Sequence, residues 1–118
     1  MNISNDGLTL WFGTPDAYAP FEGEVVERQG VSLVVGAHPA NPCNSVVVRF
    51  RVDRGLLQTV AGRELRVDYT RDLQYFAAAF PRFVTGQLVE YVPVLSCAGR
   101  QVPAYHSSER FRSFFRLK

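Results

Sequence analysis

The chain has 118 residues, of which 47% are hydrophobic and 20% are charged, and its formal net charge is +2. This length and composition fit one globular domain with its own core, and they exclude a disordered chain or a coiled coil. The small net charge does not demand an anionic partner, so we do not expect nucleic-acid binding.

The N-terminal segment, residues 1–13, lacks the basic start and the apolar stretch of a signal peptide. No apolar run approaches the ~20 residues that cross a bilayer, so we expect no membrane insertion. A complete chain would therefore be cytoplasmic. If Met1 is not native, the chain is a module of something larger.

Short runs of strand length, separated by turn residues, fill the first half of the chain. Residues 22–27 and 31–37 are two such runs. The clearest is 46–53, where apolar residues alternate with others at the period of two that marks a half-buried strand. Its core-facing residues should be Val46, Val48, Phe50 and Val52. The turn residues 53–55 then lead into a short return strand at 56–60, which predicts a hairpin.

The second half repeats this pattern. Residues 64–70 alternate as a strand, and 73–83 is also predicted as a strand, although its three alanines would suit a helix, because it is short and contains Pro81. Residues 87–95 predict a buried strand that places Val89, Tyr91 and Leu95 on one face. Pro93 cannot donate a ladder hydrogen bond, so it should lie at a bulge or an edge.

The C-terminal residues 106–118 have two interpretations. Phe111, Phe114 and Phe115 have helical spacing, and Ser108 could cap a short helix. In the strand alternative, Phe111, Ser113, Phe115 and Leu117 share one face. The sequence leaves both open.

These elements predict one all-β domain over residues 1–118. Seven or eight short strands, with no internal repeat and no long linker, favour two antiparallel sheets packed face to face.

Several short motifs resemble the later strands of fibronectin type III and related immunoglobulin-like sandwich domains. They are Phe80-Pro81, Thr85-Gly86, Val89-Glu90-Tyr91 and Ala98-Gly99. In those domains a turn leads into a strand with a buried tyrosine, and a glycine-containing loop follows. The pattern is also loosely similar to immunoglobulin-like accessory domains of glycoside hydrolases. The resemblance covers residues 31–104; it implies an immunoglobulin-like two-sheet sandwich and brings no catalytic residues.

In such a sandwich the strands 46–53 and 87–95 are antiparallel neighbours, so the loops 38–44 and 96–101 would meet at one end. These loops contain Cys43 and Cys97. We expect two free thiols in a reducing cytosol, and a disulfide is the alternative. The side chains that we expect to contact a partner there are Asn41, Asn44, Arg100 and Gln101.

No pattern in the chain predicts catalysis, a metal or a cofactor. His38 and His106 are far apart in sequence, and neither belongs to a Ser or Cys nucleophile elbow with an acidic partner. Two cysteines without further ligands are weak evidence for zinc. The basic cluster near the C-terminus is typical of a solvated face.

We therefore expect a non-catalytic binding or spacer module that presents loops for protein recognition, as part of a larger protein or assembly, with a protein partner or a neighbouring domain. The alternative is a carbohydrate-binding module. For that function the aromatic residues Trp11, Phe12, Tyr18 and Phe21 would have to form an exposed surface.

Overall fold

The structure is a computed structural model that describes residues 2–15, 19–26, 30–104, 111 and 113–118. Regular secondary structure in these residues consists of strands. Within the described ranges there is no helix long and apolar enough to span a membrane. The predicted all-β class is confirmed.

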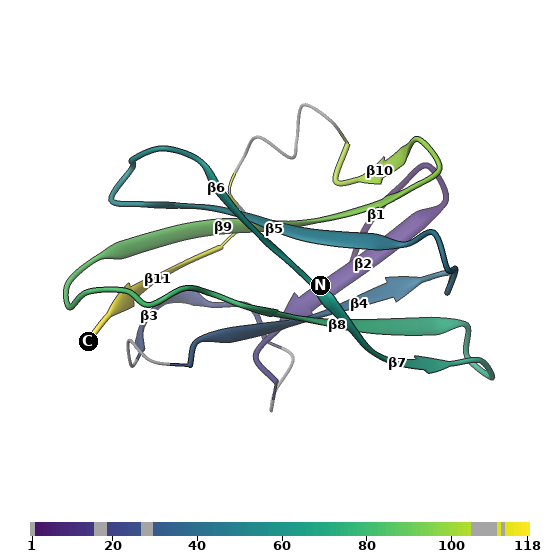
Figure 1. The fold of residues 1–118 in the computed structure, drawn as a ribbon, viewed down its shortest axis with the longest axis horizontal. Helices are drawn as coiled ribbons and strands as arrows, with labels where there is room; N and C mark the ends of the chain where they lie inside the picture. Colours follow the sequence, from purple (N-terminus) through teal and green to yellow (C-terminus); the bar gives the residue numbers. More distant parts are fainter. Residues whose placement is uncertain (1, 16–18, 27–29, 105–110, 112) are drawn as a thin grey trace.

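Two sheets pack face to face as a sandwich (Figure 1). The first sheet has the order β1-β2-β4-β8-β7, and its strands are β1 (Ile3–Asn5), β2 (Leu8–Gly13), β4 (Ser32–His38), β8 (Leu73–Ala79) and β7 (Arg63–Asp68). The second has the order β3-β11-β9-β5-β6, with β10 on β9, and its strands are β3 (Glu22–Val26), β11 (Ser113–Leu117), β9 (Leu88–Cys97), β5 (Ser45–Val52), β6 (Gln58–Ala61) and β10 (Arg100–Val102).

The core lies between the sheets and is built from alternate residues of each strand. Val46, Val48 and Phe50 of β5 are at most 2% exposed, as the alternating pattern predicts. Val89, Tyr91 and Leu95 of β9, which pairs with β5, are fully buried on the same inner face of the second sheet. The period of two therefore assigned both inner faces correctly.

Aromatic rings fill the centre of this core. Phe80 packs against Phe50 and Tyr91 with ring centroids 5.4 and 5.7 Å apart, in edge-to-face geometry that aromatic pairs prefer. Phe115 of β11 joins the cluster at 5.6 Å from Phe80. The buried hydroxyl of Tyr91 accepts a hydrogen bond of 3.2 Å from the backbone N–H of Phe21.

The tail adopts the strand alternative over residues 113–117. In β11, Ser113, Phe115 and Leu117 are buried, whereas Phe114 and Arg116 are exposed. β11 pairs antiparallel with β9 and parallel with β3, so the sheet is not purely antiparallel. Residues 106–110 and 112 lie outside the described residues.

The N-terminal hairpin of β1 and β2 was not predicted. Asp6 and Gly7 form its two-residue turn with φ values of 53° and 77°. Both residues therefore have the positive φ that a type I′ hairpin turn requires, and Asp-Gly is a favoured pair there. The turn signal was present in the sequence, but the flanking strands are short.

Two further elements differ in detail from the prediction. The predicted hairpin of β5 and β6 exists, but Leu56 lies in the connecting loop and is 88% exposed. Pro93 has no bulge at its pairing with Val48. It lies between the β11-paired and β10-paired parts of β9, where β9 pairs on one side only, so its missing N–H costs no bond there.

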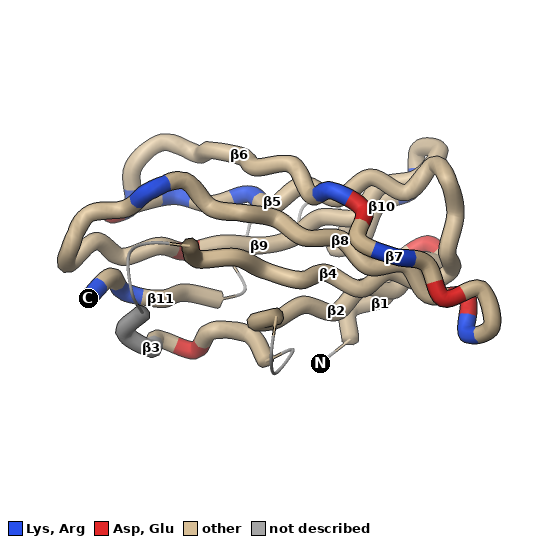
Figure 2. The backbone as a smooth tube through the Cα atoms, turned by 60° about the horizontal axis from the view of Figure 1, so that its bottom comes forward, with Lys and Arg blue, Asp and Glu red and all other residues tan. Residues whose placement is uncertain are grey.

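Charges of both signs are distributed over the sandwich (Figure 2). The single strand β7 carries two positive and two negative residues, Arg63, Glu64, Arg66 and Asp68. On the second sheet Arg51 forms an ion pair of 2.9 Å with Glu90 on the neighbouring strand. This mixture agrees with the small net charge.

Candidate functional site

Four turns gather at one end of the sandwich, on the right in Figure 1. They are residues 6–7 between β1 and β2, 39–44 between β4 and β5, 69–72 between β7 and β8, and 98–99 between β9 and β10. We call this end the tip. The predicted meeting of the two cysteine-containing loops is confirmed, because β5 starts opposite the end of β9, with Ser45 paired to Ser96.

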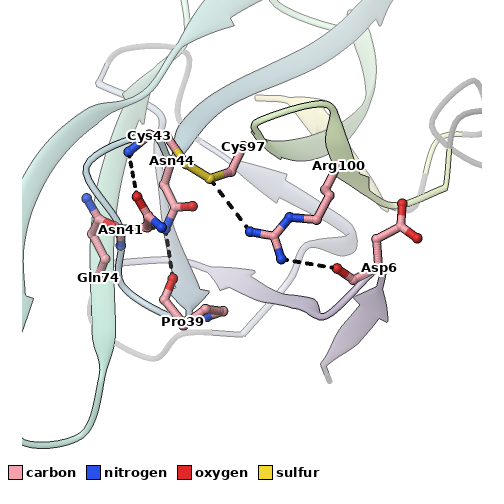
Figure 3. Close-up of a disulfide and its surroundings, with 8 residues drawn as sticks. All are labelled: Asp6, Pro39, Asn41, Cys43, Asn44, Gln74, Cys97 and Arg100. Carbon is pink, nitrogen blue, oxygen red and sulfur yellow. Dashed lines mark hydrogen bonds between the residues drawn. A yellow bond between two sulfur atoms is a disulfide. The ribbon is translucent and has the colours of Figure 1, made fainter.

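A disulfide joins Cys43 and Cys97 across the tip (Figure 3). Their Cα atoms are 5.1 Å apart, within the ~4.4–6.8 Å that a disulfide requires. The expectation of two free thiols is therefore wrong, because strand pairing brings residues separated by 54 positions to bonding distance. The bridge fixes the β4–β5 loop to the end of β9.

A buried amide network holds the β4–β5 loop from the other side. The Gln74 side-chain oxygen accepts hydrogen bonds from the Asn41 backbone N–H at 3.0 Å and from Asn44 Nδ2 at 2.9 Å. Asn44 Nδ2 also donates to the Pro39 carbonyl at 2.9 Å, and Gln74 Nε2 donates to a Glu64 carboxylate oxygen at 2.6 Å. Gln74 and Asn44 are 4% and 8% exposed, so the loop rests on a desolvated polar core.

The burial of Asn44 corrects one predicted contact residue. Its side chain points into the loop and cannot be reached by a partner, so its role is structural. Asn41 is half-buried; its side-chain oxygen accepts a hydrogen bond of 3.0 Å from the Cys43 N–H, which tightens the turn before the disulfide. Among the residues that the structure describes, the Asn44 side-chain oxygen has no hydrogen-bond partner.

Arg100 and Gln101 lie on a strand, β10, where a loop was predicted. Ala98 and Gly99 form a two-residue turn with φ values of 50° and 80°, and β10 then pairs back onto β9. The Arg100 guanidinium reaches the Asp6 carbonyl at 3.5 Å and the Cys97 sulfur at 3.9 Å (Figure 3). It thereby links the β1–β2 and β9–β10 turns.

Gln101 links the same two hairpins through its backbone. Its carbonyl accepts a hydrogen bond of 2.7 Å from Asn5 Nδ2, and its side chain donates to the Pro103 carbonyl at 3.3 Å. Arg100 and Gln101 are half-buried, so part of each side chain remains accessible. Three of the four predicted residues therefore have accessible surface at the tip.

Two hollows open at the tip. One, of about 270 Å³, is lined by the disulfide and the β9–β10 turn, and its residues are Cys43, Ser45, Ser96, Cys97, Ala98, Gly99, Arg100 and Gln101. The other, of about 330 Å³, lies on the opposite side of the β4–β5 loop, and its residues are Ala40, Asn41, Pro42, Glu64, Val67, Tyr69, Asp72 and Gln74. Tyr69 is 86% exposed at its rim.

The tip offers hydrogen-bond donors and acceptors. Among the described residues, no group of three His, Cys, Asp or Glu side chains lies close enough to hold a metal ion. His38, at the edge of the tip, is exposed, and its Nδ1 lies 3.0 Å from the Asp72 carbonyl. The side chains that remain accessible can recognise polar groups on a partner surface.

The four aromatic residues proposed for sugar stacking do not form one surface. Phe12 is 4% exposed and packs against Tyr91, and Phe21 packs against Tyr91 and Phe115. Trp11 alternates with Phe12 and therefore lies on the outer face of the first sheet. Tyr18 lies outside the described residues.

Sequence reasoning missed Gln74, which supports the tip more than any predicted residue. The signal was present, because Gln74 shares the inner face of β8 with Phe76 and Ala78, and a polar residue in a core-facing position must find buried partners. Asn5 and Asp6 were also missed, because their hydrogen bonds with Gln101 and Arg100 join residues far apart in sequence.

Comparison with known proteins identifies a similar fold and no family. No family model and no curated protein matches the chain. Two crystal structures of the uncharacterized protein lmo2446 from Listeria monocytogenes EGD-e align with TM-scores of 0.54 and 0.52, both at 15% identity. The second was determined in complex with α-D-glucose, β-D-glucose, magnesium and calcium. Each alignment covers 86% of this chain and 8% of that chain, so the resemblance is one of fold to a small part of a much longer protein.

Proposed function

We propose that this chain is a non-catalytic recognition module that binds a protein partner, or a neighbouring domain, through its tip. The observation that carries the proposal is the disulfide between Cys43 and Cys97, which fixes two turns of the tip to one another. A surface that is ordered before binding loses less conformational entropy on association, so cross-linked loops suit recognition.

The same tip is ordered from three directions. The disulfide fixes the β4–β5 loop to β9, Gln74 holds that loop from β8, and Arg100 links the β9–β10 turn to the β1–β2 turn. Loops that only connect strands do not need such support. Of the four predicted contact residues, Asn41, Arg100 and Gln101 keep accessible surface, and these are the proposed contacts.

The strand order supports the finer assignment to immunoglobulin-like domains. In their order across the first sheet, β2, β4, β8 and β7 correspond to strands A, B, E and D of such domains. In their order across the second sheet, β6, β5, β9 and β11 correspond to C′, C, F and G. We infer an immunoglobulin-like sandwich with additional strands β1, β3 and β10. Immunoglobulin-like sandwiches commonly recognise partners through end loops.

The disulfide also favours an oxidising environment over the cytoplasm for the working protein, because structural disulfides are rare where thiols are kept reduced. Thiol alkylation in intact cells, followed by mass spectrometry, tests this. Full alkylation of Cys43 and Cys97 before reduction would contradict it.

Carbohydrate binding remains the alternative function. The Listeria protein lmo2446, part of which has a similar fold, was crystallised in complex with glucose. The alignment with this chain covers 8% of the lmo2446 chain. In this chain, Trp11 is the residue of the original aromatic set that lies on an outer face within the described residues.

Cross-linked pull-down from extracts of the source organism, followed by a binding titration with the purified partner, tests the proposal. The contact variant is Arg100→Ala with Gln101→Ala, and the matched control is Arg63→Ala, an exposed arginine on β7 away from the tip. We expect the contact variant to weaken binding at least tenfold and the control to leave it unchanged. Equal binding by the folded contact variant would refute a tip interface.

A further inference from the structure

A cross-strand row of side chains covers the outer face of the first sheet. Register pairs Trp11 of β2 with Gly36 of β4, Gly36 with Tyr75 of β8, and Tyr75 with Arg66 of β7. Because these four residues are directly opposite one another and alternate with core residues, they share one face of the sheet.

The Trp11 indole lies directly over Gly36, which has no side chain. A Cβ built on Gly36 would collide with atoms Cε2, Cζ2 and Nε1 of the Trp11 ring, so the ring lies directly across β4 where only glycine leaves room. Tyr75 packs edge-to-face against Trp11 at 6.0 Å and 81°, and the Arg66 guanidinium stacks on Tyr75 at 4.2 Å. The indole is therefore held in position on the sheet surface by its neighbours.

A second row, one step closer to the tip, lies beside the indole. Ser4 pairs with Thr9, and Thr9 pairs with His38. The Ser4 and Thr9 hydroxyls are 2.9 Å apart and hydrogen-bonded. Since the Asp72 carbonyl can only accept a hydrogen bond, the His38 Nδ1 at 3.0 Å from it carries the proton, and in the neutral ring Nε2 is an acceptor.

The two rows border a hollow of about 480 Å³ lined by Asn2, Ser4, Thr9, Trp11, His38 and Leu73. Its volume falls in the ~300–1,000 Å³ range of small-molecule sites. The lining offers an aromatic ring, an aliphatic side chain, two hydroxyls, an amide and an imidazole. None of these described lining residues is a lysine, arginine, aspartate or glutamate.

This combination matches the chemistry of a neutral sugar. A pyranose ring has an apolar face of C–H groups, which contacts an aromatic ring well, and a rim of hydroxyls, which needs closely spaced donors and acceptors. A phosphate or carboxylate ligand is bound best by a cationic side chain, and the described lining residues include none.

We infer that this hollow is a binding site for a neutral saccharide, with Trp11 contacting the sugar ring and Ser4, Thr9 and His38 contacting its hydroxyls. The site lies on the sheet face and shares no residue with the proposed protein contacts at the tip. It goes beyond the proposed protein recognition and gives the alternative function, carbohydrate binding, a defined site. A glycan-binding sheet face and a protein-binding tip can operate in one module.

The single tryptophan of the chain makes the test direct. Maltotriose, cellotriose and laminaritriose are titrated into the intact protein to roughly 20 mM, because an open surface site binds with millimolar dissociation constants. The readouts are Trp11 fluorescence and the single indole N–H resonance in a ¹H–¹⁵N spectrum. We expect at least one trisaccharide to shift both signals with a saturating curve.

Two variants locate the binding. Thr9→Val keeps the shape of the side chain and removes one hydroxyl, so we expect the dissociation constant to rise about five- to tenfold. Gly36→Ala displaces the indole without changing a lining residue and should weaken binding at least tenfold. The matched control Thr59→Val, on exposed β6 of the other sheet, and the tip variant Arg100→Ala with Gln101→Ala should bind the sugar as the native protein does.

Three results would overturn the inference. The first is an unchanged Trp11 resonance with all three trisaccharides in a folded protein. The second is sugar binding that Thr9→Val and Gly36→Ala leave at native strength. The third is concentration-dependent self-association, measured by sedimentation velocity, that buries Trp11, since the occupant of the face would then be a second copy of the chain. If the tip variant still binds the protein partner, the tip proposal is wrong, but the three results above are unaffected. The two proposals can therefore be refuted separately.

Discussion

Reduction of the disulfide should destabilise the protein far more than any exposed substitution. The bridge between Cys43 and Cys97 closes a loop with a sequence separation of 54. In the chain-entropy description, a bridge that closes a loop of that length lowers the conformational entropy of the unfolded chain. Opening it should reduce the free energy of unfolding by about 4 kcal/mol at 25 °C. For a chain of 118 residues the entropy of unfolding is roughly 0.25 kcal/mol/K, so the midpoint of thermal unfolding should fall by about 16 °C.

Differential scanning calorimetry with and without a thiol reductant measures this fall. The double variant Cys43→Ala with Cys97→Ala should melt near the reduced native protein and should not respond to the reductant. The single variant Cys43→Ala is the matched control, because it removes the bridge and keeps the buried Cys97 side chain in place. If the reduced protein melts within about 4 °C of the oxidised one, a difference of roughly 1 kcal/mol, the bridge does not constrain the unfolded chain as argued.

Three further substitutions test the core and the assignment of its faces. Phe50→Ala should cost about 3–5 kcal/mol, because Phe50 is 1% exposed and packs on Phe80 and Phe83, whereas Arg51→Ala should cost under about 1 kcal/mol, because its ion pair with Glu90 is partly exposed. Urea denaturation compares them, and equal losses would contradict the assigned faces of β5. Tyr91→Phe should cost about 1 kcal/mol through loss of the hydrogen bond from the Phe21 N–H, and a denaturation midpoint identical to that of the native protein would mean that this bond contributes nothing.

The alternation of side chains in individual strands could be predicted from the sequence. The inner faces of β5 and β9 follow from a period of two, which is a local property of extended backbone. Asp6-Gly7 is an equally local signal, because Asp-Gly is a favoured type I′ pair, although its hairpin was not predicted. Ala98-Gly99 has the same two positive φ values, but alanine gives no such signal, and a loop was predicted there. The tail was ambiguous because its phenylalanine spacing fits both periods, and its pairing with β9 and β3 decided for the strand.

The candidate site depended on contacts between distant residues. The sequence of Cys43 and Cys97 is compatible both with free thiols and with a disulfide. The register of β5 against β9 brings the two residues to bonding distance. Asn44 lies in a sequence segment that is typical of a surface loop. Its side chain is nevertheless buried, because it donates a hydrogen bond to Gln74, 30 positions away.

The same division holds for the outer face of the first sheet. The sequence alone determines that Trp11 and Phe12 point to opposite sides of a strand, because successive side chains alternate. Trp11 lies over Gly36 and beside Tyr75, and the Thr9–His38 pair is next to it in the register. This arrangement is decided by the order and register of three strands, β2, β4 and β8, taken from different parts of the chain. Register is fixed only when the two sheets pack and each strand must bury its apolar face, so a site built across strands emerges with the tertiary structure.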